Sequence, residues 1–421
     1  MNTRFYNAKI LTMADDFNVM DGELWVEDSR ISYVGKPKPS HILWDREIDV
    51  SGNLIMPGFK NAHTHSAMTF LRSYADDLPL LDWLSHQVFP MEAKLSGDDI
   101  YHLSKLAIME YLTSGITSNF DMYLSNEQAA KASIDCGFRT VLCGGISNYF
   151  GSAEELENWY LKFNGDNELI SFCLGFHGEY TSSRESLEKI AALSRKYKAP
   201  VFTHNSETHS EVEQCIERYG MTPTTFLNSI GMFEYGGGGY HCIHMTEQDL
   251  EIFQKKKLSV VTNSGSNCKL ASGVAPIKKM MDMGINLAIG TDGPASNNCL
   301  DMFREMFLTT ALQKIKEQDA SAVDANEVLY MATVGGAKAM GLTECDTLSE
   351  GKLADLIVID LKQPNMQPIN HITKNIVYSG SKQNVKLTMV NGKILYENNE
   401  FIDIDAEAVY AKANEIINSK R

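Results

Sequence analysis

The sequence predicts an α/β fold: a distorted (β/α)8 TIM-type barrel with a small β-sandwich domain formed by both chain ends. Eight short apolar runs between residues 54 and 292 alternate with amphipathic segments, as strands and helices do in a parallel barrel. The two ends of the chain instead carry short runs of alternating hydrophobicity, which indicate antiparallel strands. Several central runs end in histidine or an acidic residue. The active site of such a barrel lies at these strand ends.

The chain ends are expected to pair with each other. The β-like runs near the N-terminus are AKILTM, ELWVEDSRISYVG and REIDVSGNLIM, and those near the C-terminus are ADLIVIDL, NIVYSG and VKLTMVNGKILYENN. Asn391-Gly392 is a hairpin signal, and a helix is expected over AEAVYAKANEIINSK. We predict a composite β-sandwich domain of residues 1–56 and 347–421 around a barrel domain of residues 57–346.

The central pattern predicts eight strand and helix units in order. The strands are expected at residues 54–63, 115–121, 139–147, 170–178, 200–206, 239–244, 258–264 and 286–292. Helices are expected at 96–115, 183–197 and 246–256, the first closing on Gly115 and the last opening with a capping pattern at Thr246 and Asp249.

Composition narrows the classes of partner. The chain has 38 Lys and Arg against 54 Asp and Glu, a net charge of −16, and no basic run longer than QKKKL. Phosphate backbones need a basic surface, so we expect no nucleic-acid partner. No segment is apolar enough for a signal peptide or a membrane span, and the eight cysteines stand singly. We therefore expect a cytoplasmic protein with reduced thiols and no membrane partner, and homo-oligomerisation is left open.

The stretch PGFKNAHTHS places His63 and His65 two residues apart after an apolar run. In a strand, residues i and i+2 point to the same face, so both imidazoles can converge on one atom. A metal ion suits that geometry. Two histidines in an ordinary turn are the alternative, and the rest of the chain decides between them.

Further polar residues close other predicted strands. The strand-end set is His63 and His65 on strand one, His177 on strand four, His204 on strand five, His241 on strand six and Asp292 on strand eight. Each alone could be a buried structural residue or a turn former. Their recurrence at the same end of the strands indicates one active site. Three imidazoles and a carboxylate suit Zn²⁺, with Fe²⁺ as second choice, and leave a position for water.

Glu207 follows His204 by three residues in THNSETHS. It lies on the loop that leaves strand five, within reach of the substrate, and is the natural proton carrier. The alternative is an acidic residue that stabilises a helix N-terminus through the helix dipole.

The chain resembles the amidohydrolase superfamily, and within it the branch of S-adenosylhomocysteine and methylthioadenosine deaminases with the related triazine chlorohydrolases. The resembling segments are PGFKNAHTHSAMTFLRSYADDLPLLDWLSHQVFPMEAKL, THNSETHSEVEQCIERYG, YHCIHM, SNCKLASGVAPI, GTDGPASNN and EGKLADLIVIDL. The resemblance implies one divalent metal, zinc first and iron or manganese as alternatives, held by His63, His65, His204 and Asp292. A two-metal site would need a lysine at the end of strand four, and ISFCLGFHGEY has none.

The resemblance also implies a reaction. A hydrolase of this branch removes an amino group from an aromatic heterocycle, with the metal lowering the pKa of a water molecule. Glu207 would deliver a proton to the ring nitrogen. His241 would not bind the metal but would act with Asp292 on the water. Ammonia would leave after protonation.

Substrate contacts are implied at three positions. In members that act on purine nucleosides, a glutamate after strand one holds the ribose hydroxyls and a strand-four histidine contacts the substrate. Glu92 and His177 match these positions, and Trp83 is expected to form a pocket wall. Met68 stands where guanine deaminases carry glutamine.

The chain departs from its relatives near the expected pocket. The strand-three segment LCGGISNYFGSAEELEN contains no arginine for a substrate carboxylate. GFHGEY places Glu179 beside His177, where it is expected to face N–H donors of the substrate. VTNS puts Thr262 in the place of a histidine.

We therefore expect a small-molecule substrate of adenosine type: methylthioadenosine, 5′-deoxyadenosine or adenosine, with S-adenosylhomocysteine behind them. A free nucleobase, a pterin or an aminotriazine is the alternative within the enzyme class. The alternative of another class is a barrel that has lost catalysis and serves as a binding scaffold. Such a barrel would be expected to lose metal ligands or the proton carrier, and this chain keeps both.

Overall fold

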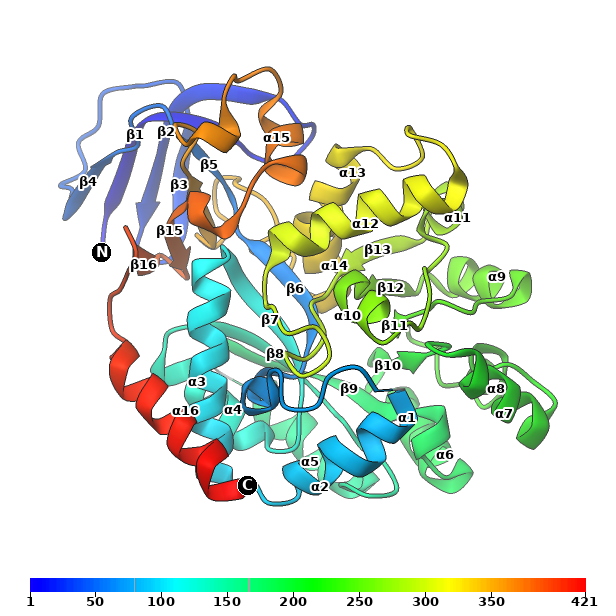
Figure 1. The fold of residues 1–421 in the computed structure, drawn as a ribbon. Coiled ribbons are helices and arrows are strands. Elements are labelled where there is room, and N and C mark those ends of the chain that lie inside the picture. Colours follow the sequence, from blue (N-terminus) through cyan, green and yellow to red (C-terminus); the bar gives the residue numbers. More distant parts are fainter. Residues whose placement is uncertain (79, 166) are drawn as a thin grey trace.

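The computed structural model describes residues 1–78, 80–165 and 167–421, and in this part of the chain it contains two sheets. Eight parallel strands form a nearly closed barrel surrounded by helices (Figure 1). In chain order, which is also the order of hydrogen bonding, they are β6 (Phe59–Thr64), β7 (Ile116–Met122), β8 (Arg139–Cys143), β9 (Ile170–Gly178), β10 (Val201–Asn205), β11 (Gly237–His241), β12 (Ser259–Thr262) and β13 (Asn286–Ile289). The barrel predicted from periodicity is confirmed.

Hydrogen bonds from side chains and from the backbone close the barrel between its first and last strands. The Asn61 amide donates to Thr291 Oγ1 and accepts from the Thr291 N–H, both at 2.8 Å. The N–H of Asp292 donates to the carbonyl of His63 at 3.0 Å. These bonds hold the end of β6 against the segment that follows β13, so His63 and Asp292 come together although they lie far apart in the sequence.

The helices connect successive strands and cover the outside of the barrel (Figure 1). Short helices α1 (Leu80–Trp83) and α2 (Phe89–Glu92) lie in the long connection from β6 to α3. The others are α3 (Gly97–Thr113), α4 (Asn126–Asp135), α5 (Ala153–Phe163), α6 (Arg184–Tyr197), α7 (His209–Tyr219), α8 (Pro223–Ser229), α9 (Glu247–Lys256), α10 (Ser264–Lys269), α11 (Ile277–Asp282), α12 (Met302–Glu317), α13 (Ala325–Tyr330) and α14 (Gly336–Met340).

The predicted helix ends are confirmed. Thr246 and Asp249 form a reciprocal capping box at the start of α9, which satisfies two backbone N–H groups. Gly115 follows α3 with φ of 73°, a left-handed conformation that glycine adopts without a steric penalty. No helix of the described residues combines the length and hydropathy required to span a membrane.

Both chain ends contribute to the second sheet. In the described residues it has nine strands in the order β17-β16-β15-β14-β5-β1-β2-β3, with β4 paired to β1. These strands are β1 (Thr3–Leu11), β2 (Val19–Glu27), β3 (Arg30–Gly35), β4 (Arg46–Asp49), β5 (Leu54–Pro57), β14 (Leu356–Ile359), β15 (Val385–Val390), β16 (Lys393–Glu397) and β17 (Glu400–Phe401). The expected pairing of the chain ends is confirmed, in one continuous mixed sheet.

The first predicted barrel strand, residues 54–63, is two strands. Its first half is β5 of the nine-stranded sheet, and its second half is β6 of the barrel. Gly58 separates them. A Cβ on Gly58 would lie 2.1 Å from Cγ2 of Thr117, so any larger residue here would force the buried Thr117 side chain to move. The predicted domain boundary between residues 56 and 57 stays a prediction. It lies at the end of β5, next to the point where the chain changes sheet.

The strand expected over NIVYSG, residues 375–380, is wrong, because this segment lies mainly in helix α15 (Ile372–Tyr378). Its β-branched residues suggested a strand. The buried positions are Thr373, Ile376 and Val377, a spacing that places them on one face of a helix. The N–H of Gly380 donates to the carbonyl of Asn375 and ends the helix.

The last helix, α16 (Ala406–Lys420), is confirmed in its extent. It leaves the nine-stranded sheet and packs along α3 of the barrel (Figure 1). Lys420 forms an ion pair of 2.9 Å with Asp99 in the first turn of α3. The C-terminal helix therefore contacts the barrel domain as well as following the terminal sheet.

Candidate metal centre and substrate pocket

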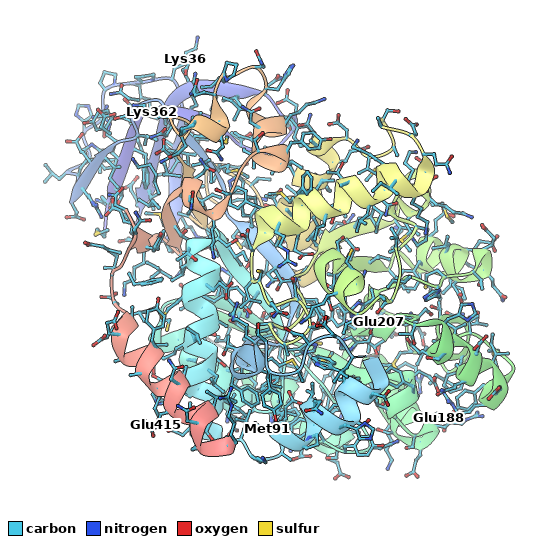
Figure 2. All side chains as sticks on the ribbon, in the orientation of Figure 1. Lys36, Met91, Glu188, Glu207, Lys362 and Glu415 are labelled. Carbon is cyan, nitrogen blue, oxygen red and sulfur yellow. The ribbon has the colours of Figure 1, made fainter. Side chains whose placement is uncertain are left out.

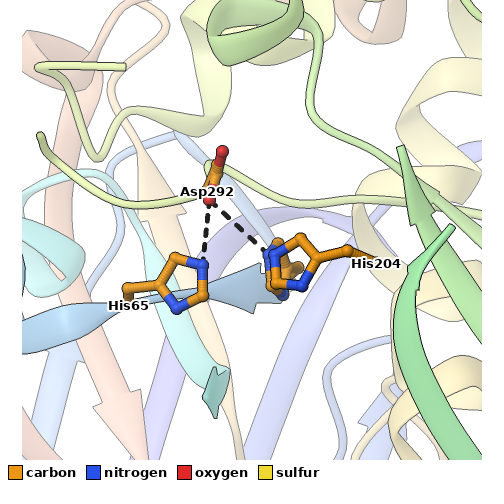
Figure 3. Close-up of side chains that lie close together, drawn as sticks. His65, His204 and Asp292 are labelled. Carbon is orange, nitrogen blue, oxygen red and sulfur yellow. Dashed lines mark ion pairs between the residues drawn. The ribbon is translucent and has the colours of Figure 1, made fainter. Parts of the chain in front are cut away.

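Four side chains converge at the C-terminal ends of the barrel strands (Figure 3). They are His63 from β6, His65 just after β6, His204 from β10 and Asp292 just after β13. One possible ligand atom of each lies within 4.8 Å of those of the others. His63 is fully buried, and the other three are nearly so. The structure brings these four predicted residues together.

Two of the histidines are oriented by main-chain carbonyls. His65 Nδ1 lies 2.6 Å from the Met122 carbonyl, and His204 Nδ1 lies 2.6 Å from the His177 carbonyl. A carbonyl only accepts, so each Nδ1 carries the hydrogen. The lone pair of each Nε2 is then free for a metal ion. Hydrogen bonds of this kind orient metal-binding histidines in proteins.

His63 has no hydrogen-bond partner at either ring nitrogen among the described residues. Its ring stacks on Tyr240 at 3.7 Å between centroids, and its Nε2 lies 3.5 Å from Asp292 Oδ1. Burial lowers its pKa to about 3, so the ring is neutral. A buried polar group without a partner is rare, and a metal ion would supply the missing partner of Nε2.

Asp292 is held firmly by its surroundings. Ser266 and Ser296 donate hydroxyls to its Oδ2 at 2.6 and 3.0 Å, and the N–H of Gly293 donates to Oδ1 at 2.8 Å. Its backbone has φ of 58°, an unusual conformation for aspartate that is found mainly where the surroundings impose it. Burial disfavours the charged form, but the neighbouring histidines outweigh burial and hold the pKa well below its usual range.

The donor set fits one divalent cation. Burial lowers the pKa of His65, but its contacts with Asp292 and the Met122 carbonyl outweigh burial and raise it to about 9. His65 Nε2 lies 3.3 Å from Asp292 Oδ1, so a positive charge between these two atoms is favoured. A divalent cation can take this position with His65 neutral, because metal ligands bind in their deprotonated form. Three imidazoles and one carboxylate with an open position match a catalytic site for zinc or a similar metal.

His241 lies beside this cluster. Its Nδ1 is 2.7 Å from Oδ1 of Asn267, so Nδ1 carries the hydrogen that the amide oxygen accepts. Its Nε2 faces two carboxylates, Glu207 Oε2 at 3.8 Å and Asp292 Oδ2 at 3.9 Å. This places an imidazole nitrogen able to hold a proton between the predicted proton carrier and the predicted metal ligand.

Glu207 lies on the loop between β10 and α7, apart from the labelled Glu188 on α6 (Figure 2). Its carboxylate is buried, accepts from the Ser272 hydroxyl at 3.0 Å, and has a pKa raised mainly by burial. Helix α7 begins after Glu207, with Thr208 as its N-cap and Glu211 as the acidic residue of its first turn. Glu211 also accepts from the N–H groups of Ser206 and Glu207. Glu211, not Glu207, is therefore the acidic residue that stabilises the N-terminus of α7. The Glu207 carboxylate is available to the pocket.

A pocket of about 600 Å³ opens above the cluster. His65, His204, Asp292, Glu207 and His241 line one part of it. Most other lining residues are apolar or aromatic, and they include the predicted wall residue Trp83, together with Phe89, Met122, Tyr123, Leu124, Tyr149, Phe150, Tyr180 and Leu270. A concave, mainly apolar pocket with a few converging polar groups is typical of a small-molecule site.

Two predicted substrate contacts also line the pocket, Glu92 and His177. Glu92 lies at the end of α2 and is nearly buried, and its Oε1 has no hydrogen-bond partner among the described residues. Burial raises the pKa of Glu92 to about 7. Nδ1 of His177 lies 3.0 Å from the Thr181 hydroxyl. Glu92 thus offers an acceptor to a donor that enters the pocket.

Glu179 is not brought to the pocket, which corrects the expected contact with the substrate. It is buried, and its Oε2 forms an ion pair of 2.5 Å with Arg218 of α7. The chain turns into a short 3-10 helix at Glu179–Thr181, so Glu179 no longer follows the strand that carries His177. Thr262 is the other position at which this chain departs from its relatives. It is the last residue of β12, is buried, and does not line the pocket.

The sequence did not reveal the residues that support the site. Asn267 and Ser272, which contact His241 and Glu207, lie on α10 and just after it. Tyr149 and Phe150 reach the pocket from the loop after β8. The segment SNCKLASGVAPI stood out by resemblance, but the direction of each side chain in it depends on tertiary packing.

A parallel barrel whose strand ends present three imidazoles, a carboxylate and a buried acid defines the class of metal-dependent hydrolases. Residues 54–395 match the sequence model of the Amidohydrolase family, and the chain belongs to this family. It is a hydrolase that acts on C–N bonds and uses a divalent metal.

Similar proteins agree with this placement. A 5-methylthioadenosine/S-adenosylhomocysteine deaminase of Caldanaerobacter subterraneus subsp. tengcongensis is 40% identical, over 97% of this chain and 96% of its own. The protein of the same name from Pyrococcus furiosus is 37% identical, over 97% and 98%. A crystal structure of an adenosine deaminase from Xanthomonas campestris with bound zinc superimposes with a TM-score of 0.94 at 30% identity, over 100% and 98% of the two chains.

Proposed function

We propose that this chain hydrolytically deaminates adenosine-type nucleosides, with methylthioadenosine, 5′-deoxyadenosine and adenosine as candidate substrates. The observation that carries the proposal is the buried Glu207 carboxyl, which lies 3.8 Å from His241 beside the metal cluster in an apolar pocket. Relatives 37–40% identical over almost the whole chain are named as deaminases of nucleosides of this kind, which supports the choice of substrate class.

The proposed cofactor is one zinc ion, with iron or manganese as alternatives, held by His63, His65, His204 and Asp292. The unpartnered His63 nitrogens and the two carbonyl-oriented histidines support this ligand set. When bound, such a metal acts as a Lewis acid that lowers the pKa of a water molecule.

The proposed proton transfers use three side chains. Glu207 has a raised pKa, so it can deliver a proton to the ring nitrogen beside the carbon that carries the amino group, which makes that carbon electrophilic. Ser272 holds Glu207 in place. Asp292 Oδ2 and His241 Nε2 are 3.9 Å apart. This pair takes one proton of the attacking water and passes it to the amino group, which leaves as ammonia, and Glu207 recovers the second proton of the water as the carbonyl forms.

Glu92 supports a nucleoside over a free base. A ribose hydroxyl would donate to its Oε1, which is buried and unpaired, whereas a nucleobase, a pterin or an aminotriazine has no ribose to fill this position. A buried acceptor without a donor costs roughly 1–3 kcal/mol. His177 is proposed to contact the substrate, and Trp83 to form an apolar wall.

The test is ammonia release from adenosine, 5′-deoxyadenosine, methylthioadenosine, adenine, guanine, a pterin and an aminotriazine. Activity on the nucleosides supports the proposal. Activity confined to the free bases, the pterin or the aminotriazine would show that these compounds, and not nucleosides, are the substrate class. No ammonia from any of these compounds, in a protein that holds its metal, would favour the non-catalytic scaffold. Glu188→Gln on α6, far from Glu207, is the matched control for Glu207→Gln.

A further inference from the structure

Two aromatic rings at the mouth of the pocket bear on its specificity. Phe89 at the start of α2 and Tyr149 in the loop after β8 form this pair, which we name the outer clamp. Their ring centroids are 6.2 Å apart. Phe89 is 36% exposed and Tyr149 is 82% exposed, although both line the pocket. The outer clamp therefore lies at the mouth, away from the buried metal cluster.

The outer clamp is placed on rigid supports. Phe89 and Glu92 are three residues apart on α2, so they lie on the same face of the helix. The Tyr149 loop is fixed because the N–H of Asn148 donates to the Thr181 carbonyl and its side-chain oxygen accepts from the N–H of Ser183, both at 2.8 Å. A ribose held at Glu92 would thus direct its 5′ substituent toward the mouth of the pocket, about one helical turn away, where the substituent can lie against the outer clamp.

The pocket offers no cation to that substituent. Among the described residues that line it, the charged side chains other than histidine are the carboxylates Glu92, Glu207 and Asp292, and no lysine or arginine is present. Two lysines are sequence neighbours of lining residues, but each is bound elsewhere. Lys94 donates to the carbonyl of Lys420, and Lys269 forms an ion pair with Asp76.

We propose that the outer clamp selects neutral, apolar 5′ substituents, such as a thioether, over an amino-acid tail that carries a carboxylate. This inference rests on the proposed nucleoside deaminase function. Aromatic rings gain from contact with a methylthio group or a short alkyl chain. A carboxylate at the same position would lose part of its hydration without gaining a cationic partner, and the pocket beside it already holds three acidic residues.

The test compares four nucleosides that differ at the 5′ position: 5′-deoxyadenosine, methylthioadenosine, 5′-butylthioadenosine and S-adenosylhomocysteine. The butylthio compound has the length of the homocysteine tail without its charges, so it separates charge from size. In the wild-type protein, kcat/KM for S-adenosylhomocysteine is expected to be at least roughly tenfold below that for the butylthio compound. Equal or better turnover of S-adenosylhomocysteine would overturn the inference while leaving the proposed function intact.

Two variants test the clamp itself. Tyr149→Arg places a cation at the mouth and is expected to raise the ratio of kcat/KM for S-adenosylhomocysteine to that for the butylthio compound by about fivefold, the worth of a partly exposed ion pair. Ile315→Arg, at a 74% exposed position on α12, controls for the change in net charge. An equal rise in both arginine variants, or none in Tyr149→Arg, would refute the role of the clamp.

Phe89→Ala is expected to lower the ratio of kcat/KM for the butylthio compound to that for 5′-deoxyadenosine, because only the former has a tail to contact the ring. Phe307→Ala, at another partly exposed phenylalanine on α12, is its matched control. An unchanged ratio in Phe89→Ala would place the tail elsewhere. Failure to deaminate any of the four nucleosides would overturn the proposed function and this inference with it.

Discussion

Glu92→Gln tests ribose recognition through a single oxygen. In the structure Glu92 Oε1 is buried at the pocket wall and makes no hydrogen bond of normal geometry to the described residues, although the Tyr123 hydroxyl lies beside this carboxyl. A nucleoside would bring a ribose hydroxyl to it. Glutamine keeps an oxygen acceptor but removes the charge. A hydrogen bond to a charged group is worth about 1 kcal/mol more than a neutral one, and with the misplaced amide N–H the loss reaches about 2 kcal/mol. We expect kcat/KM for nucleosides to fall roughly five- to thirtyfold, mainly through a higher KM.

The pH dependence of Glu92 gives a second readout. Burial raises its pKa to about 7. Above this pH the ionised carboxylate accepts a hydrogen bond from the ribose hydroxyl. Below this pH the carboxyl is protonated and lacks the negative charge that strengthens this bond. Because the charged form binds, kcat/KM for a nucleoside should rise as the pH increases through neutrality, and Glu92→Gln should remove this part of the profile.

The assay is ammonia release under initial-rate conditions with methylthioadenosine and with adenine, from about pH 5.5 to 8.5, a range that spans the Glu92 titration. Adenine has no ribose, so its kcat/KM should be nearly the same in the wild-type protein and Glu92→Gln. An equal fall for adenine and the nucleoside would show that Glu92 supports the fold or the chemistry, and would refute ribose recognition by this residue.

Three further predictions concern the metal, the proton carrier and stability. His63→Ala should lower metal content, measured by atomic emission, and turnover together, whereas full turnover without bound metal would reject the ligand assignment. Glu207→Gln should keep its metal and lose on the order of a thousandfold in kcat, whereas a rate near that of Glu188→Gln would return Glu207 to a structural role. Arg139→Ala should lower the free energy of unfolding in urea by about 3–5 kcal/mol, because it leaves Asp355 as an unpaired buried charge; a loss below about 1 kcal/mol would show that water or another cation compensates.

The metal cluster could be predicted from the sequence because strand geometry determines it. His63 and His65 follow a two-residue period, and the ends of parallel strands meet at one edge of a barrel. Neither property depends on side-chain packing, so the ligand geometry agrees with the prediction although Asp292 is distant in sequence.

The two wrong predictions concern segments whose conformation depends on tertiary contacts. Glu179 was expected beside His177 near the substrate, but β9 ends at Gly178, and Arg218 of α7, far away in the sequence, binds the carboxylate. The segment 375–380 is rich in β-branched residues, yet the burial of Ile376 and Val377 against the core favours a helix there. Local propensity is a weak guide when packing opposes it.

The measurement that tests the central claim most directly is a titration of metal-depleted protein with zinc, following ammonia release from methylthioadenosine. One cluster of three histidines and an aspartate is found in the described residues, and the proposed chemistry requires a metal there. Activity should rise in proportion to zinc and level off at about one equivalent per chain. Full activity in the metal-depleted protein, or no ammonia release at any zinc concentration, would contradict the account.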